Sequence, residues 1–441
     1  MFKLIPVTIV ACSLFFASCS SSDGTDNANN QTPDPAALTL LQRLGELEGV
    51  TASSIAATDH FSQAFELRIS QPLRHGDASS PHFEQRVFIS HVDETAPVVL
   101  ELGGYSATHG SAVELATLLS ANQVKVEYRF FGVSLPDPID WDALTLRQAA
   151  DDHHRIVTLL SDIYTGAWLN SGTSKGGATA MIHRRYYPDD VAATFAYVAP
   201  VLQDQLDSRL TDYLLEAGDE ACRDRVKRFQ QLVLENREAV MAEFVQWASA
   251  NNHTFERWPM DLALEYGVLE YYPQYFQWNP FPCESIPEEG ADAATLFNHL
   301  LLTVPLQLYV DSNHLLVSYY HQAALEIGEY AFITDHLDGL LVPDPQPVFT
   351  RLAPLADVAY QGETMADVLS WVRNEGTNIV LLYGGADLWT AAAVELNGGT
   401  NAIKVVVPGA VHSVQISDAP ESDREAIYVA LESWLGVTIN R

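Results

Sequence analysis

A serine flanked by glycines is the first group of residues whose types and spacing could perform catalysis. Residues 172–176 read Gly-Thr-Ser-Lys-Gly, so Ser174 has a glycine two positions away on each side. A serine hydroxyl is a weak nucleophile at neutral pH, and it needs a nearby base and an exposed place on a tight turn. Glycines at these positions allow the close approach of strand and helix that such a turn imposes. The motif predicts that Ser174 is a nucleophile, although Gly-x-Ser-x-Gly also arises by chance in a long chain.

An acid and a base follow Ser174 in the chain order of a Ser-Asp-His triad. Asp387 comes directly after the apolar run 378–383. His412 lies in the loop after the next apolar run, 403–407. Taken alone, Asp387 could be a turn or helix-cap aspartate and His412 a surface histidine. Because order, spacing and loop placement agree, we predict a triad of Ser174, Asp387 and His412.

Two backbone N–H groups must stabilise the oxyanion that forms when such a serine attacks a carbonyl group. One donor would be Lys175, the residue after the nucleophile. The second is expected in the loop after an earlier strand, where residues 103–105 read Gly-Gly-Tyr after an apolar run. We predict the N–H of Gly104 or Tyr105 as this donor, and a plain turn with two glycines is the alternative.

The sequence carries no motif for a metal ion or a cofactor. It contains no His-Glu-x-x-His and no Cys-x-x-Cys. Lys175 is followed by glycine rather than by Ser or Thr, so the glycine pairs do not make a nucleotide-binding P-loop. We therefore predict neither a metal site nor a cofactor.

The elements around these residues indicate an α/β protein. Alternating apolar and polar residues predict antiparallel strands, whereas continuous apolar runs predict buried parallel strands. Helical spacing lies between parallel strands, as in a βαβ unit. The antiparallel candidates are 65–69 and 86–89; the parallel candidates are 97–102, 124–128, 167–170, 194–198, 378–383 and 403–407; the helices are 112–121, 144–164 and 421–435.

A mostly helical segment interrupts this pattern. Long amphipathic helical spacing begins near residue 209, and Pro and aromatic residues crowd 255–287 before the buried-strand pattern returns. We predict a catalytic α/β domain built from two segments, 36–202 and 356–441. The helical segment between them, 203–355, is expected to form a cap.

The charge balance excludes several classes of protein. The 441 residues include 57 Asp and Glu against 24 Lys and Arg, a formal charge of −33. Such a chain repels phosphate backbones and anionic lipid headgroups, so we expect no nucleic-acid partner and no membrane attachment through basic patches. The hydrophobic fraction of 47% is ordinary for a globular protein and argues against a disordered chain.

The N-terminus resembles an export signal. Residues 1–18 carry Lys3 followed by an apolar run that is too short to span a bilayer. Small residues then precede Cys19, as in a bacterial lipoprotein signal, and residues 19–35 are polar like a flexible tether. We predict an exported lipoprotein, held in the periplasm or on the cell surface only by a lipid anchor at Cys19. An ordinary secretion signal is the alternative.

Two cysteines remain in the predicted folded part, Cys222 and Cys283, because Cys12 would leave with the signal. Outside the cytoplasm an even pair of cysteines is more often bridged than free. We therefore predict a disulfide between Cys222 and Cys283.

Several runs of sequence together resemble a known family. They are Glu-Tyr-Arg-Phe-Phe-Gly-Val-Ser-Leu-Pro at 127–136, Leu-Thr-Leu-Arg-Gln-Ala-Ala-Asp at 144–151, Ser-Gly-Thr-Ser-Lys-Gly-Gly at 171–177, Arg-Arg-Tyr-Tyr-Pro at 184–188 and Tyr-Val-Ala-Pro at 197–200. With these runs the chain is similar, over about residues 71–412, to the secreted prolyl tri- and tetrapeptidyl aminopeptidases. These are serine peptidases with the α/β-hydrolase fold, distantly similar to lysosomal Pro-X carboxypeptidase and dipeptidyl peptidase II.

The resemblance implies an α/β-hydrolase fold with a helical cap inserted between the nucleophile half and the acid and histidine half. It implies the same triad, and peptide substrates from whose N-termini short peptides are released, proline-containing tri- and tetrapeptides among them. The chain departs from the relatives at Tyr128, where they usually carry His, and at Leu388, where Pro is frequent. Glu127 and Arg129 could bind substrate or brace the fold; bracing is favoured, because charged residues at a strand end are usually paired.

An enzyme acting on N-termini must hold an α-ammonium group, and cap acids such as Glu326 and Glu329 could do so. From the sequence alone, acids on a solvated helix face are the favoured reading of these two residues, and amine binding is the alternative. Because fold and triad do not fix the acyl group, a carboxylesterase or lipase is the rival enzyme. A surface binding protein on a decayed hydrolase scaffold is the non-enzymatic alternative, and the intact order of the triad speaks against it.

Overall fold

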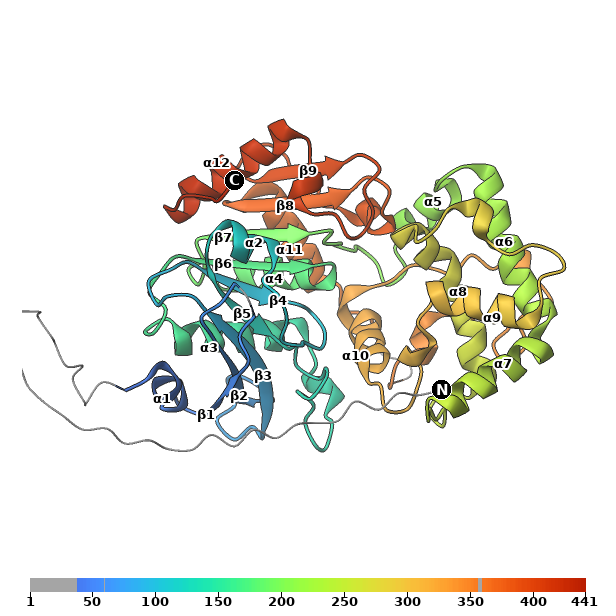
Figure 1. The fold of residues 1–441 in the computed structure, drawn as a ribbon, viewed down its shortest axis with the longest axis horizontal. Helices are drawn as coiled ribbons and strands as arrows, with labels where there is room; N and C mark the ends of the chain where they lie inside the picture. The colour runs from blue at the N-terminus through green and yellow to red at the C-terminus, as the bar shows by residue number, and fades with distance from the viewer. Residues whose placement is uncertain (1–37, 59, 356–358) are drawn as a thin grey trace, which may run out of the picture. The chain divides into compact units, whose positions relative to one another are not determined.

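A mixed β-sheet lies at the centre of the catalytic half of the protein (Figure 1). The computed structural model describes residues 38–441 except 59 and 356–358. The predicted signal at 1–18, most of the segment before residue 40, and the proposed lipidation residue Cys19 lie outside the described residues. No helix in the described part of the chain is both long and apolar enough to span a bilayer.

Nine strands among the described residues form this sheet, in the order β1-β2-β3-β5-β4-β6-β7-β8-β9. The first three strands and β5 pair antiparallel, and the sheet runs parallel from β5 to β9. With the Gly-x-Ser-x-Gly turn between β6 and α4, this is the predicted α/β-hydrolase arrangement. The strands are β1 (Val50–Ile55), β2 (Gln63–Pro72), β3 (His82–His91), β4 (Val98–Leu102), β5 (Asn122–Val126), β6 (Trp168–Thr173), β7 (Ala193–Tyr197), β8 (Ile379–Gly384) and β9 (Ile403–Val407).

Helices cover both faces of the parallel part of the sheet, so every residue of β7 and β8 is buried. On β8, Ile379 and Leu381 join the core that contains Met181 of the helix after the nucleophile. Val380, between them, joins the opposite core, which contains Ile427 of the last helix. The helices of this half are α1 (Leu40–Gly45), α2 (Glu114–Leu118), α3 (Leu146–Leu160), α4 (Lys175–Tyr186), α11 (Glu363–Asn374) and α12 (Glu421–Leu435).

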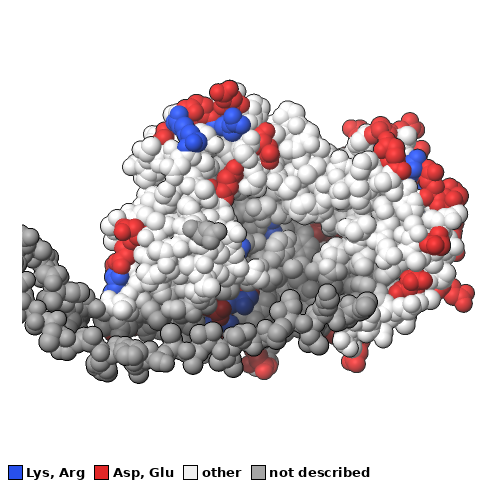
Figure 2. Space-filling view, viewed as in Figure 1, with Lys and Arg blue, Asp and Glu red and all other residues white. Residues whose placement is uncertain are grey.

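A second group of helices forms the cap to one side of the sheet (Figure 1). One apolar core runs from Phe229 and Tyr271 of the cap to Met181 and Leu381 beside the sheet, so the cap packs on the catalytic half. Asp and Glu side chains gather on the outer surface of the cap (Figure 2). The cap helices are α5 (Ser208–Glu216), α6 (Glu220–Glu235), α7 (Arg237–Ala250), α8 (Met260–Trp278), α9 (Ala293–Thr303) and α10 (Leu315–Gln322), and the π-helical turn Ala323–Ile327 follows α10.

A disulfide joins Cys222 of α6 to Cys283 in the loop between α8 and α9, which is the predicted pairing. The two residues are 61 positions apart, and closing a loop of that length stabilises a fold by about 4 kcal/mol in the chain-entropy description. We expect the double substitution Cys222→Ser, Cys283→Ser to lower the free energy of unfolding by an amount of this order in a denaturant titration. Reductant should destabilise the wild type and leave the double variant unaffected. Free thiols in the denatured, unreduced wild type would contradict the bridge.

Candidate active site

The turn that carries Ser174 has the strained geometry expected of an exposed nucleophile. Ser174 lies between the end of β6 and the start of α4, with φ 59° and ψ −126°, a left-handed conformation that is unfavourable for a serine. A Cβ on Gly172 would lie 2.3 Å from the backbone of Gly176, and one on Gly176 would lie 2.3 Å from the carbonyl oxygen of Leu102. Both glycines are therefore required for the close contact between α4 and the sheet. The half-buried Ser174 side chain makes no capping hydrogen bond to the helix.

Asp387 and His412 meet in the loops that follow β8 and β9. His412 Nδ1 lies 2.8 Å from Asp387 Oδ2, and both side chains are buried. The other carboxylate oxygen accepts a hydrogen bond from Trp389 N–H at 3.1 Å. Because an ionised carboxylate only accepts hydrogen bonds, Nδ1 of His412 carries the proton and Nε2 keeps its lone pair. This is the tautomer that a general base for a serine requires.

The end of α8 holds the His412 loop against the cap. His412 N–H donates to the carbonyl oxygen of Gln277 at 3.2 Å, and the ring of Trp278 lies edge-on to the imidazole with centroids 5.0 Å apart. Gln277 also lines the hollow onto which Ser174 opens. The cap therefore fixes the position of the predicted base as well as covering the predicted nucleophile.

The loop after β4 lies directly on the nucleophile turn, as the oxyanion prediction requires. Gly104 has φ 73°, and a Cβ there would lie 2.8 Å from Gly176 N and 3.0 Å from Lys175 C. Among the described residues, none accepts a hydrogen bond from the backbone N–H of Lys175 or of Tyr105. Both N–H groups are thus available to a ligand, and Lys175 and Tyr105 line a pocket together with Ser174.

Two hollows meet at Ser174. The first is a small pocket whose wall is mostly apolar. The second lies under the cap and is lined by polar, aromatic and leucine side chains. Figure 2 shows that the surface is hollowed where the cap meets the catalytic half. The apolar pocket is lined by Tyr105, Leu146, Ser174, Lys175, Ala178, Thr179, Ile182, Pro200, Leu202, Tyr319, Ile327, Met365 and Trp389. No group of three or more His, Cys, Asp or Glu side chains in the described part of the chain is placed to hold a metal ion.

Glu329 lines the hollow under the cap together with Ser174. It is buried, it accepts hydrogen bonds from Tyr319 Oη and from Tyr330 N–H, and burial raises the pKa of its carboxyl group to about 8. Its backbone is fixed by Gln205, which accepts from Glu329 N–H at 2.9 Å, and by Asp207, whose N–H donates to the Glu329 carbonyl at 3.0 Å. A solvated helix face was the wrong reading of this residue.

Glu326 has a different environment from Glu329. It is also buried, but its carboxylate accepts a hydrogen bond from Leu146 N–H at 2.8 Å, at the first residue of α3. Burial raises the pKa of Glu326 to about 7. Glu326 does not line the hollow that contains Ser174. Of the two acids proposed to bind an amine, Glu326 accepts a hydrogen bond from the first residue of α3, and only Glu329 lines the hollow that Ser174 also lines.

Sequence reasoning missed another buried acid near this hollow, Glu270 of α8. Its carboxylate accepts hydrogen bonds from Tyr320 Oη at 2.9 Å and Tyr330 Oη at 2.5 Å, and burial raises its pKa. It lines a hollow that shares Gln274 with the one containing Ser174. The signal was present in the sequence, because Glu270 is an isolated acid within an apolar and aromatic run at 268–272.

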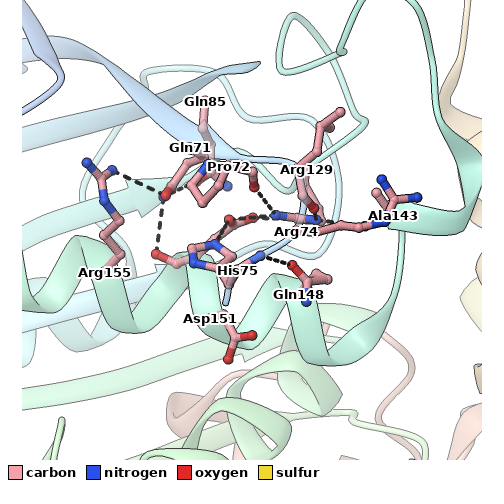
Figure 3. A network of polar contacts seen from close by, with 12 residues as sticks. Gln71, Pro72, Arg74, His75, Gln85, Arg129, Ala143, Gln148, Asp151 and Arg155 are labelled. Atoms are coloured by element: carbon pink, nitrogen blue, oxygen red, sulfur yellow. Dashed lines mark hydrogen bonds and ion pairs between the residues drawn. The ribbon is translucent and has the colours of Figure 1, made fainter. Parts of the chain in front are cut away.

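Arg129 and Glu127 brace the fold, as favoured from the sequence. Arg129 is fully buried and donates to both carboxylate oxygens of Asp152, at 2.6 and 2.8 Å. It also donates to the carbonyl oxygens of Leu73 and Ala143, at 2.9 and 2.7 Å (Figure 3). Glu127 accepts from the N–H groups of three loop residues. They are Ala107, Val133 and Ser134. Neither charge is free to bind a substrate.

Comparisons with known proteins identify the family to which the chain belongs. The family model described as PS-10 peptidase S37 matches residues 34–441. The chain is 32% identical over 379 residues to the prolyl tri/tetrapeptidyl aminopeptidase of Streptomyces mobaraensis, covering 83% of this chain and 79% of that protein.

Solved structures with low similarity include a proline iminopeptidase from Mycobacterium smegmatis, at 14% identity and a TM-score of 0.38, covering 82% of this chain and 96% of that one. They also include acetyl xylan esterase 1 from Thermoanaerobacterium sp. JW/SL YS485, at 12% identity and a TM-score of 0.36, covering 89% and 91%. The match to the family model spans nearly the whole chain, and the resemblance inferred from the sequence motifs is confirmed. The chain belongs to the S37 family of serine peptidases.

Proposed function

We propose that this serine peptidase is an exported aminopeptidase that releases short peptides, including proline-containing tri- and tetrapeptides, from the N-termini of polypeptides. The observation that carries the proposal is the buried carboxylate of Glu329 in the roofed hollow that also contains Ser174. A carboxylate in this hollow can form an ion pair with the α-ammonium group at the N-terminus of a peptide substrate. An endopeptidase, which cleaves internal bonds, does not need to bind that group. The curated relative from Streptomyces mobaraensis carries the corresponding name.

The proposed chemistry uses Ser174, Asp387 and His412. His412 Nε2 removes the proton of the Ser174 hydroxyl as its oxygen attacks the scissile carbonyl, and Asp387 stabilises the imidazolium that forms. His412 then gives this proton to the leaving amine, and the short peptide stays attached to Ser174 as an acyl-enzyme. Water activated by His412 hydrolyses the ester in the second half of the reaction. The backbone N–H groups of Lys175 and Tyr105 bind the oxyanion in both halves.

In this proposal each of the two hollows binds a different part of the substrate. The apolar pocket at Ser174 would take the side chain whose carbonyl is attacked, and the compact hydrocarbon ring of proline suits walls such as Ala178, Ile182 and Met365. The hollow under the cap would take the residues that precede it and end at Glu329. Because the cap closes over this hollow, the length of the released peptide would be set by the room between Ser174 and Glu329.

Replacing Glu329 tests this proposal directly. Acetylating a peptide substrate removes a charge-assisted contact worth about 1.5–3 kcal/mol, so we expect the wild type to prefer the free peptide by roughly tenfold to a hundredfold in kcat/KM. The substitution Glu329→Gln should abolish most of this preference. Glu326→Gln is the matched control and should retain it, because Glu326 caps α3. An unchanged preference in Glu329→Gln would place the amine elsewhere, and cleavage of esters without amides would favour the carboxylesterase reading.

The same preference should depend on pH. The pKa of Glu329 is about 8 because the group is buried, so the free enzyme holds it protonated at neutral pH. A salt bridge to an ammonium group needs the carboxylate, and it is lost as pH falls below this value. We expect the ratio of kcat/KM for free and acetylated peptides to fall between pH 8 and pH 6.

Export and lipid anchoring are also part of the proposal, carried by the sequence before residue 36 alone. We expect Cys19→Ala to move the enzyme from the membrane fraction to the soluble fraction without changing kcat/KM, since the catalytic residues all lie beyond residue 100. Ser20→Ala is the matched control and should stay with the membranes. Membrane fractionation that finds the wild type wholly soluble would contradict the anchor.

A further inference from the structure

The side chain of Lys175 is buried beside the nucleophile without a carboxylate partner. Lys175 is 5% exposed, and no described acid forms an ion pair with its ammonium group. Burial alone lowers its pKa well below the ordinary value for lysine. A buried amine of this kind is costly unless its donors are used, so its surroundings indicate what it does.

One hydrogen bond accounts for the direction of the Lys175 side chain. Its Nζ donates to the carbonyl oxygen of Gly104 at 2.6 Å. Three aromatic rings surround the amine, with Nζ 3.5 Å from the ring centroid of Tyr128, 4.9 Å from that of Phe131 and 5.3 Å from that of Tyr105. If the Lys175 amine is protonated, the faces of these rings attract its charge. If the amine is neutral, the same rings still pack against it. In either protonation state the amine is a donor, and Gly104 O is the acceptor it meets.

The acceptor belongs to the peptide unit that carries the second predicted oxyanion donor. In a trans peptide the C=O of one residue and the N–H of the next point in opposite directions. The buried amine of Lys175 therefore holds the Gly104 carbonyl pointing toward Nζ. The N–H of Tyr105, in the same peptide unit, then points away from Nζ. That N–H has no acceptor among the described residues, and Tyr105 lines the pocket that contains Ser174.

The backbone conformation at Gly104 explains why this peptide needs to be held. Gly104 has φ 73°, a conformation that glycine adopts freely and also leaves easily. Rotation of the 104–105 peptide would replace the inward N–H by a carbonyl oxygen, which repels an oxyanion. A buried donor fixed to Gly104 O prevents that rotation.

We propose that the Lys175 side chain is a positioning residue, which locks the Gly104–Tyr105 peptide so that Tyr105 N–H serves the oxyanion. Lys175 then contributes twice, with its own backbone N–H as one donor and with its side chain holding the other. The inference rests on the proposed role of Ser174 as nucleophile. Covalent labelling of Ser174 by a fluorophosphonate tests that role separately, so the two can fail independently.

The substitution Lys175→Met tests the lock, because methionine keeps the apolar stem and removes the donor. Losing one oxyanion donor lowers kcat roughly a hundredfold to a thousandfold. We expect a loss of this size with KM changed less than about threefold, and an equal loss of affinity for a peptide boronic acid, whose tetrahedral adduct places an oxygen at the oxyanion position. Affinity for the product peptide should be unchanged. Lys404→Met, which removes a lysine over the ring of Tyr383 outside the site, is the matched control and should behave as wild type.

A second measurement, the ratio of the hydrolysis rates of an ester and its thiono analogue, tests the oxyanion site directly. Thiono esters place sulfur where the oxyanion would form, and sulfur is a poor hydrogen-bond acceptor. The wild type should hydrolyse an ester much faster than its thiono analogue, and this ratio should fall in Lys175→Met. If Lys175→Met does not fold, Tyr128→Leu, which opens the aromatic enclosure, should show the same changes to a smaller degree. A normal kcat and a normal ester-to-thiono-ester ratio in a folded variant would overturn the proposal. So would equal losses of boronic acid and product affinity, which would indicate general damage.

Discussion

Ser174→Ala is expected to lower kcat about a millionfold, because it removes the nucleophile on which every later step depends. The side chain is half-buried on a turn and makes no capping hydrogen bond, so the loss of one hydroxyl should leave the melting temperature nearly unchanged. Active-site labelling with a fluorophosphonate should disappear together with peptide hydrolysis.

The control for this variant is Ser161→Ala, which replaces an exposed serine at the end of α3. It should keep full activity and full labelling. If Ser174→Ala retained more than a small fraction of the wild-type rate, with the purity of the preparation verified by mass, the nucleophile would have to lie elsewhere.

Asp387→Asn should be the next most severe substitution, with a loss of roughly ten-thousandfold in kcat. The asparagine amide can present an N–H to His412 Nδ1, which favours the tautomer whose Nε2 carries the proton. Such an imidazole cannot remove the proton of Ser174, and the amide does not stabilise the imidazolium. Because the substitution keeps the shape of a fully buried side chain, KM should change much less than kcat.

Asp367→Asn provides the matched control, since Asp367 is an exposed residue of α11 paired with Arg185. It should have wild-type kinetics. A near-normal rate for Asp387→Asn would mean that another group orients His412.

The parts of the site closest in sequence to Ser174 were the easiest to predict. Strand, turn and helix around residues 172–176 are a local arrangement. A Cβ added to Gly172 or Gly176 would lie less than 3 Å from neighbouring backbone, so only glycine fits at these positions. The apolar run of β8 was equally clear, because helices cover both faces of the sheet there and all six residues of the strand are buried.

Elements that depend on distant neighbours were predicted less well. β1 carries Thr and Ser on its exposed positions, and it exists as a strand because β2 offers it a free edge, which no local pattern reveals. The helix expected over 112–121 is only α2 (Glu114–Leu118), since the chain turns at Ser120, with φ 46°, to enter β5.

Glu326 and Glu329 of the cap show most clearly what the spacing of residues in the sequence cannot predict. Glu326 and Glu329 are three residues apart, a spacing that puts two side chains on one face of a continuous helix. The helix ends between them, at Gly328 with φ 88°, where a Cβ would lie 2.2 Å from the carbonyl oxygen of Asp204. The resulting change of direction separates the two carboxylates, one toward α3 and one toward the hollow at Ser174.

The most direct measurement of the proposed function is mass spectrometry of products from two synthetic polypeptides. Each would be about 20 residues long with proline at position 3 and again near the middle, and they would differ only by an acetyl group on the N-terminus. The proposed function predicts that the free peptide first releases its N-terminal tripeptide and that the acetylated one reacts roughly tenfold to a hundredfold more slowly. Early cleavage at the internal proline, at the same rate in both peptides, would contradict it.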